Sequence, residues 1–471
     1  MRDARRLQRG FGDGFVAEAV SDLQEAWMRH ADALLDDDGL VSAVYEALGR
    51  RHPKSRTRGR RGAPAEMVLR LLVLKHVRNW SYAIMEREVR TNLVYRDFTR
   101  VGGGKVPDAK TMGRWGVALG PTVIATLHRR VVALALQHQV VKGRQMRLDT
   151  TVVETNIHYP TDSSLLGDGV RVLTRTMQQV TAIAGPVGAT LRNRSRSVTR
   201  RLWEIGRIAR SKGAPRQEKL TRAYQQLLAA TSRVVGQAKR FSQEIGAGVK
   251  RAADLVHQAA LEGFRRELDT FVTRVQQVIR QTRARILRGD THVEDKLLSL
   301  FEPSTEVIRK GKAGKPNEFG KLVKLQEAEQ QIITAYVVYD TRPSDSELVI
   351  PALDMHEQVF ARVPRLVAGD AAFYSGTNEA AAHAKGVTRV CVPNRSTKSA
   401  ERKREQKKRW FRNGQKWRTG CEGRISVVKR RHGLNRCRYK GADGMKRWVG
   451  LGVIADNLIN IGCVLATRAR P

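Results

Sequence analysis

The spacing of apolar residues changes along the chain, and this change most limits the folds open to it. Residues 15–140 have helical spacing, as in the amphipathic segment Ala17–Asp36 and the apolar run after Pro64. From Gln145 the sequence reads MRLDTTVVETNIHY, whose β-branched residues and period of two are typical of a strand. Helical spacing returns over about 175–300, and strands and helices alternate after Pro303. The pattern predicts an α/β protein with a sheet flanked by helices.

The length of 471 residues predicts two or three domains, because one hydrophobic core rarely serves so long a chain. We expect a helical N-terminal domain over 1–140, an α/β core over 141–175 with 301–471, and a helical insertion over 176–300. Ser211–Pro215 is expected to break the insertion, and its apolar stripe to pack or dimerise. The stripe includes Leu268, Phe271, Val272, Val275 and Ile279.

The charge of the chain calls for an anionic partner. Lys and Arg number 86 against 46 Asp and Glu, which gives a formal net charge of +40. This charge is spread along the chain, whereas a membrane binder usually confines it to one segment. A nucleic acid is therefore the expected partner, with no membrane involved. No signal-like apolar run follows the N-terminus, and the scattered cysteines indicate neither a zinc site nor a disulfide framework, so a cytoplasmic location is expected.

The most apolar segment, Val449–Ala466, contains Asp456, Asn457 and Asn460. These polar residues would be costly in lipid but are ordinary in a protein interior. The segment is therefore expected to be a core element.

One N-cap candidate lies in the N-terminal region, because Asp108 could cap a helix that starts near Ala109. Ser81 and the segment VPDAKTMGRW are expected to give short helices separated by tight turns. A helix-turn-helix that reads DNA and a helical bundle that only packs are about equally favoured by this pattern.

Two aspartates stand out by their surroundings. Asp149 lies inside an apolar strand, where an unpaired charge is costly, and Asp370 follows LVAG at an expected strand end. Both are candidates for metal-binding carboxylates at one end of a sheet. For either residue alone, capping of the next element is the better interpretation.

Glu422 is the third candidate. Arg418, Glu422 and Lys429 share one face of an expected helix, because seven residues make nearly two turns. Gly420 and Gly423 weaken that helix, and a surface ion pair between Arg418 and Glu422 explains the spacing equally well.

Other carboxylates could replace one of the three. Asp162 ranks first among them, although its position just after the strand favours N-capping of the next helix. The others are Glu154, Asp168, Asp354 and Glu357.

Aromatic residues lie within a long basic stretch that starts at Lys398. Trp410, Phe411 and Trp417 could stack on splayed DNA bases or belong to the core, and both readings ask for the same residue types. Arg430 and Arg431 extend the basic stretch toward the C-terminus and are further candidates for DNA binding.

The order Asp, Asp, Glu along the chain resembles the DDE transposases of bacterial insertion sequences. The matching segments include RLDTTVVETNIHYPTDSSLLGDGVRVLTR, LVAGDAAFYSG and CEGRISVVKRRHGLNRCRYKG. The N-terminal APAEMVLRLLVLKH and VPDAKTMGRW resemble the DNA-binding region that precedes the core in such proteins. The resemblance implies a ribonuclease H-like core and leaves the helical insertion unexplained.

One subgroup of these transposases has a Tyr-x2-Arg-x3-Glu-x6-Lys signature. Arg418, Glu422 and Lys429 match it, while Gln415 stands where the tyrosine is expected. The chain is therefore similar to a related group, and most of all to the one often labelled ISNCY.

The resemblance implies cleavage and strand transfer at element ends by a two-metal mechanism. Asp149, Asp370 and Glu422 would hold two Mg²⁺ ions, for which Mn²⁺ could substitute. Arg418 and Lys429 would grip phosphates. Terminal inverted repeats and target DNA would be the partners of a homodimer that is associated with the nucleoid. The alternatives are an inactive, transposase-derived DNA-binding protein and a ribonuclease H-like nuclease that does not join strands.

Overall fold

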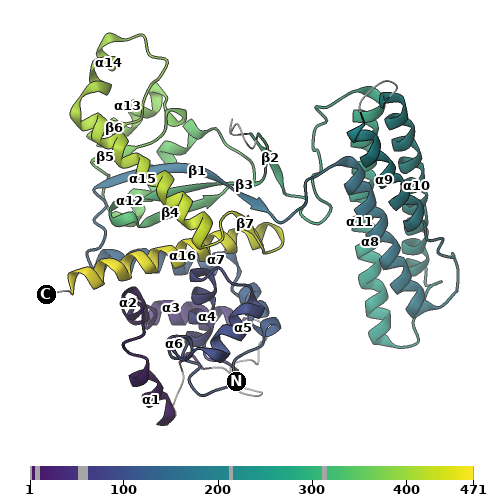
Figure 1. Cartoon of the computed structure of the whole chain (residues 1–471), viewed down its shortest axis with the longest axis horizontal. Coiled ribbons are helices and arrows are strands. Elements are labelled where there is room, and N and C mark those ends of the chain that lie inside the picture. Colours follow the sequence, from purple (N-terminus) through teal and green to yellow (C-terminus); the bar gives the residue numbers. More distant parts are fainter. Residues whose placement is uncertain (1–2, 6–10, 51–61, 212–215, 310–315, 470–471) are drawn as a thin grey trace. The chain divides into compact units, whose positions relative to one another are not determined.

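The computed structural model describes residues 3–5, 11–50, 62–211, 216–309 and 316–469. They form two compact units, one of residues 1–156 with 307–471 and one of residues 157–306 (Figure 1). The second unit includes a stretch before residue 176, where the insertion was expected to begin. The expected division into an N-terminal domain, a core and an insertion, with boundaries at 140, 175 and 301, stays a prediction.

The N-terminal part of the first unit is helical, as expected. Its helices are α1 (Phe11–Ala19), α2 (Ala26–Leu35), α3 (Asp38–Gly49), α4 (Ala65–Val77), α5 (Tyr82–Thr91), α6 (Leu93–Phe98) and α7 (Ala109–Gln137). Ser81 caps α5 by accepting from the Ile84 N–H, and Asp108 caps α7 by accepting from the Thr111 N–H. The cap expected at Asp108 is confirmed.

The single helix expected over Ala17–Asp36 is wrong. The chain leaves α1 at Ala19 and re-enters a helix at Ala26. The Ser21 hydroxyl donates to the Glu18 carbonyl at 2.9 Å, which offers the backbone an alternative to the helical ladder.

The last helix, α16 (Gly441–Arg468), completes the core of the N-terminal helices. Leu451, Ile454 and Leu458 of α16 belong to the same buried cluster as Trp27 of α2 and Leu127 of α7. The N-terminal helices therefore share their core with the opposite end of the chain.

α7 and α16 are long and apolar enough to span a membrane, although core helices pass the same test. Of the apolar window of α16, 67% is buried within the protein. Asn457 is buried there and donates to the Ile333 carbonyl at 2.8 Å. The segment Val449–Ala466 thus lies in a largely buried core helix, as expected.

A lysine is buried where α4, α5 and α16 meet. The ammonium of Lys75 lies 4.9 Å from the ring centre of Tyr82, 5.0 Å from that of Tyr439 and 4.7 Å from that of Trp448. The side chain is 2% exposed. Burial, with the nearby Arg438 charge, lowers the pKa of Lys75 to about 7, although the Cys437 thiol acts in the opposite direction.

One mixed sheet forms the centre of the first unit. Its strands run in the order β2-β3-β1-β5-β6, with β4 also paired to β3 and β7 to β1. β3 is antiparallel to both β1 and β4, whereas β5 and β7 are parallel to β1, and β6 is parallel to β5. The strands are β1 (Gln145–Thr155), β2 (Glu306–Ile308), β3 (Glu318–Glu327), β4 (Ile333–Val338), β5 (Leu366–Ala368), β6 (Arg389–Cys391) and β7 (Arg436–Cys437).

Helices cover both faces of this sheet. Met146 and Leu148 of β1 pack with Leu353 of α12 on one face, and Val153 packs with Val428 of α15 on the other. The helical elements are η1 (Glu329–Gln331), η2 (Asp345–Leu348), α12 (Val349–Phe360), η3 (Ala371–Phe373), α13 (Gly376–Ala384), α14 (Ala400–Lys407) and α15 (Arg409–Arg431). The elements expected over 321–385 are present, including the adjacent strands β3 and β4.

The described residues of the second unit form four helices, α8 (Asp162–Ala184), α9 (Ser195–Arg210), α10 (Arg216–Gly246) and α11 (Leu255–Arg288). Leu268, Val272, Val275 and Ile279 are buried in its core, so the expected apolar stripe packs inside the unit. Residues 212–215 of the expected break lie outside the described residues.

Asp162 was expected to be the N-cap of the helix after β1, but it is not the N-cap of α8. Thr161 holds that position and accepts from the Ser164 N–H at 3.1 Å. Asp162 is the first helical residue, is 2% exposed and pairs with Arg285 at 3.0 Å. It therefore serves the second unit as a buried ion-pair partner.

Candidate active site

Asp149 and Asp370 occupy matching positions on neighbouring strands. β1 and β5 are parallel, and their last paired residues are Arg147 and Ala368. Each aspartate stands two residues beyond that pair, so the same register places them level with each other. Neighbouring strands lie about 4.8 Å apart, so the register places the half-buried Asp149 of β1 next to the half-buried Asp370, which follows the end of β5.

The backbone holds both carboxylates. Asp149 accepts from the N–H of Thr150 at 2.7 Å, and Asp370 caps η3 by accepting from the N–H of Ala371. Capping is thus part of the role of Asp370, in line with the alternative interpretation of its position.

α15 crosses the face of the sheet on which Asp149 lies. Successive strand residues point to opposite faces, so Asp149 shares a face with Arg147 and Val153. Arg147 lies against Gly420 of α15, and Val153 packs with Val428 further along the same helix. Asp149 is between these two contacts and therefore faces the middle of α15, where Glu422 lies.

The pKa of the buried Cys421 thiol on α15 reflects the carboxylates nearby. Burial raises the pKa of Cys421 well above its usual value, and the charges of Glu327 and Asp149 raise it further. Cys421 thus lies between α15 and the sheet, next to Glu422 in sequence.

Arg418, Glu422 and Lys429 all lie on α15, which confirms the expected helix despite Gly420 and Gly423. Glu422 has a side chain that is 56% exposed and pairs with Arg418 at 2.8 Å. The expected alternative, an i,i+4 ion pair, is therefore formed. Lys429 lies two turns beyond Glu422, and Arg430 and Arg431 are exposed at the end of the helix.

Some N–H donors of the Arg418 guanidinium have no acceptor among the described residues. Its side chain is only 15% exposed, and its Nε and Nη1 atoms are buried with no hydrogen-bond partner among the described residues. Buried guanidinium donors without acceptors are costly. The role expected of Arg418 in binding phosphate stays a prediction.

Gln415 stands where the subgroup signature has tyrosine, and it joins two strand ends. Its amide donates to the carbonyl of Cys391 at 2.7 Å and to that of Gly369 at 3.4 Å. Since Gly369 precedes Asp370, this contact fixes the end of β5 against α15. The sequence pattern gave no indication of this contact.

Among the described residues, no three His, Cys, Asp or Glu side chains converge closely enough to hold a metal ion. The two aspartates nevertheless provide hard oxygen donors side by side, which suits Mg²⁺. Glu422 would have to exchange Arg418 for the metal to complete the set.

A buried ion pair supports the strand that carries Asp149. Arg147 of β1 pairs with Glu327, directly opposite on β3, and also donates to the Trp417 carbonyl of α15. Its guanidinium lies 4.8 Å from the Trp417 ring centre. Sequence reasoning missed this pair, because the partners are far apart in the chain and only the register of β1 and β3 brings them together.

Replacing Glu327 by alanine is expected to lower the free energy of unfolding by about 3 kcal/mol, because Arg147 would remain buried without its counter-charge. Chemical denaturation of both proteins measures the loss. Glu401→Ala, at an exposed position on α14, is the matched control and should change little. A double change of Arg147→Met with Glu327→Leu should recover most of the loss; if it does not, the destabilisation has another cause.

Trp410 and Trp417 are both half-buried at the N-terminal half of α15, whereas Phe411 is fully buried. Phe411 packs with Ala368 and Cys391. It is a core residue, as one of the two expectations had it, while both tryptophans retain exposed surface.

The comparisons with known families point to one activity. Residues 16–116 match the family described as Transposase domain (DUF772), and residues 377–461 match the family described as Transposase DDE domain. The second match includes Arg418, Glu422 and Lys429, whereas Asp149 and Asp370 lie between the two matched segments. No curated protein and no solved structure matches the chain. The two family matches support a DDE transposase of the insertion-sequence type.

Proposed function

We propose that this transposase cleaves DNA at the ends of an insertion sequence and joins the freed ends to target DNA. The observation that carries the proposal is the parallel register that sets Asp149 level with Asp370, beneath the helix that carries Arg418, Glu422 and Lys429. The strand order also supports a ribonuclease H-like core. β4, β3 and β1 are successively antiparallel, and β5 and β6 follow in parallel with β1.

In the proposed site Asp149, Asp370 and Glu422 would hold the divalent cations. When bound, Mg²⁺ activates an attacking oxygen and stabilises the leaving oxygen of the phosphodiester. The chain itself aligns the DNA. Arg418 presents buried N–H groups to a phosphate next to the cleaved bond, and Lys429 contacts another phosphate along α15.

Exchange of partners at Glu422 belongs to this proposal. Without DNA, Arg418 neutralises Glu422. A phosphate that binds Arg418 would release the Glu422 carboxylate for the metal. DNA would then help to assemble the site that cuts it.

The test is strand cleavage and joining on labelled DNA that carries the ends flanking the gene, with Mg²⁺, Mn²⁺ or EDTA. Metal-dependent nicking at the ends and joined products, both lost in Asp370→Asn, would support the proposal. Cleavage without joining under every condition would indicate a nuclease. Binding without cleavage would indicate an inactive DNA-binding descendant.

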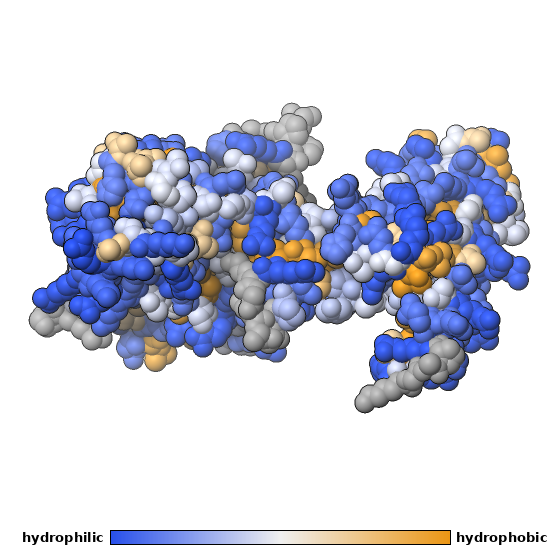
Figure 2. All heavy atoms as spheres, turned by 90° about the horizontal axis from the view of Figure 1, so that it is seen from above, coloured by the Kyte–Doolittle hydropathy of each residue, from blue (hydrophilic) through white to orange (hydrophobic). Residues whose placement is uncertain are grey.

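DNA binding is expected to fall by about 1,000-fold between 50 and 200 mM salt, because each phosphate contact of Lys or Arg releases a counterion. Hydrophilic residues cover most of the face seen in Figure 2, in line with the net charge of +40. Fluorescence anisotropy with a labelled duplex measures this slope. A flat salt response would contradict a basic DNA-binding surface.

The remaining parts of the proposal follow the family. The N-terminal helices, with capped α5 and α7, would bind the terminal inverted repeats, and the protein would act as a homodimer on DNA, in the cytoplasm at the nucleoid. Size determination of the complex on paired ends tests the dimer.

A further inference from the structure

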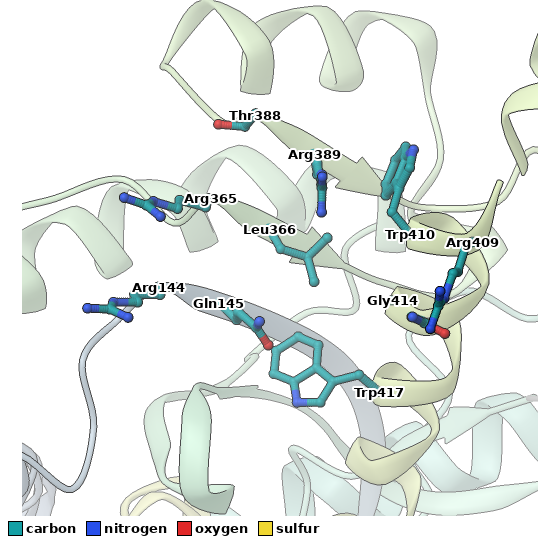
Figure 3. A pocket seen from close by; sticks show the side chains of 11 residues that line it. Arg144, Gln145, Arg365, Leu366, Thr388, Arg389, Arg409, Trp410, Gly414 and Trp417 are labelled. Carbon is teal, nitrogen blue, oxygen red and sulfur yellow. The ribbon is translucent and has the colours of Figure 1, made fainter.

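A pocket lies at the ends of β1, β5 and β6 where these strands begin. Its cavity volume is 780 Å³, and the first half of α15 forms its wall (Figure 3). Arg144, Arg365, Arg389 and Arg409 line it together with Trp410 and Trp417. Among the described residues, no Asp or Glu lines this pocket.

Three of the arginines form a ladder across neighbouring strands. The Arg365 N–H donates to the Arg144 carbonyl at 2.8 Å, and the Arg389 N–H donates to the Arg365 carbonyl at 2.9 Å. Like charges on adjacent strands repel. Within the part of the chain that the structure describes, none of the three side chains forms an ion pair.

The backbone under this ladder is fixed in advance. The Glu329 carboxylate accepts from the N–H groups of Gly143 at 3.0 Å, Arg144 at 2.6 Å and Gln145 at 3.1 Å. The start of β1 is thereby held in place. Arg144 is thus presented by a rigid strand start.

The two tryptophans add flat apolar surfaces to the pocket. The Trp417 indole points toward Gln145 and has the buried Arg147 over its ring at 4.8 Å. The Arg389 guanidinium lies 5.6 Å from the ring centre of Trp410. Both rings are held by neighbours while they line the cavity, so a planar group could stack there at little entropic cost.

We propose that this pocket binds an unpaired nucleotide of a DNA strand, with the arginines on its phosphate and the tryptophans on its base. The inference rests on the proposed function and deepens it. From Gln145 to Asp149 the strand rises about 13 Å, which equals about four stacked nucleotides of DNA. A DNA strand that runs from the carboxylates along α15 would reach the pocket within a few nucleotides. The pocket would then recognise unpaired DNA independently of the cleavage step.

The test compares binding of a labelled single-stranded oligonucleotide and of the matched duplex, by anisotropy in EDTA. The double change Arg365→Gln with Arg389→Gln is expected to weaken single-strand binding about tenfold more than duplex binding, because the phosphate contacts beside the stacked base are lost. Arg196→Gln with Arg200→Gln, at exposed positions on α9, removes the same charge and should affect both probes equally. Equal losses from the two double variants would overturn the proposal.

A second pair of variants separates stacking from charge. Trp410→Leu should lose single-strand binding, while Trp410→Phe should retain most of it. The Arg365→Gln with Arg389→Gln variant should melt no lower than the wild type without DNA, because it relieves the repulsion of the ladder. Two results together would overturn the assignment to a DNA strand. One is displacement of the labelled oligonucleotide by micromolar free deoxynucleotide, and the other is no selective loss of single-strand binding in the variants. EDTA prevents metal-dependent cleavage, so these binding results do not depend on the outcome of the cleavage assay.

Discussion

Asp149→Asn is expected to lower the rate of metal-dependent DNA cleavage by about 1,000-fold or more. The change keeps the size of the side chain but removes the charge that would be shared between two cations. Each ~1.4 kcal/mol of lost transition-state stabilisation lowers the cleavage rate tenfold, and several kcal/mol are expected to be lost. Single-turnover cleavage of labelled element ends measures the rate, and anisotropy should show DNA binding close to that of the wild type.

Asp354→Asn is the matched control for this change. Asp354 lies on α12, outside the proposed site, and pairs with Lys385 at 2.6 Å, so its replacement should leave cleavage unchanged. Asp370→Asn and Glu422→Gln should behave as Asp149→Asn does. Full activity in any one of the three would remove that residue from the site.

Lys75→Met is expected to raise the free energy of unfolding at about pH 7 by about 4 kcal/mol. In the unfolded chain the Lys75 pKa is near 10.5, whereas burial lowers it to about 7 in the folded protein. Each unit of difference costs about 1.4 kcal/mol. Methionine fills a similar volume without a charge that has to be desolvated or neutralised.

The pH dependence follows from the same shift. Between pH 7 and pH 10.5 the unfolded chain binds more protons at Lys75 than the folded protein does, so stability due to this group rises with pH over that interval. From about pH 7 to about pH 9 the wild type should gain about 2 kcal/mol relative to Lys75→Met. Chemical denaturation at both values checks this difference. A constant difference would mean that Lys75 does not titrate in this range.

Local patterns in the sequence predicted the elements that carry the candidate site. The period of two around Asp149, the strand end before Asp370 and the helical spacing of Arg418, Glu422 and Lys429 are all properties of short segments. They could be recognised without knowledge of the rest of the chain. The cap at Asp108 was predictable for the same reason.

Contacts between distant segments could not be predicted in this way. The pairing of Arg147 with Glu327 depends on the register of β1 and β3, and the contact of Gln415 with the ends of β5 and β6 depends on how α15 crosses the sheet. The arginine ladder did leave a signal, because Arg144, Arg365 and Arg389 each stand at the start of an expected strand. Each one alone resembles an ordinary charged residue at a strand end, and only the order of the strands unites them.

Because α16 fills the core of the N-terminal helices, their folding depends on the order of synthesis. Ribosomes add about 5–20 residues per second, so the residues up to Gln137 wait roughly 15–60 s before α16 is made. During that time their apolar faces lack a partner and are open to chaperones, proteases or other nascent chains. A fragment that ends before α16 would lack Leu451, Ile454 and Leu458 and would leave that core incomplete.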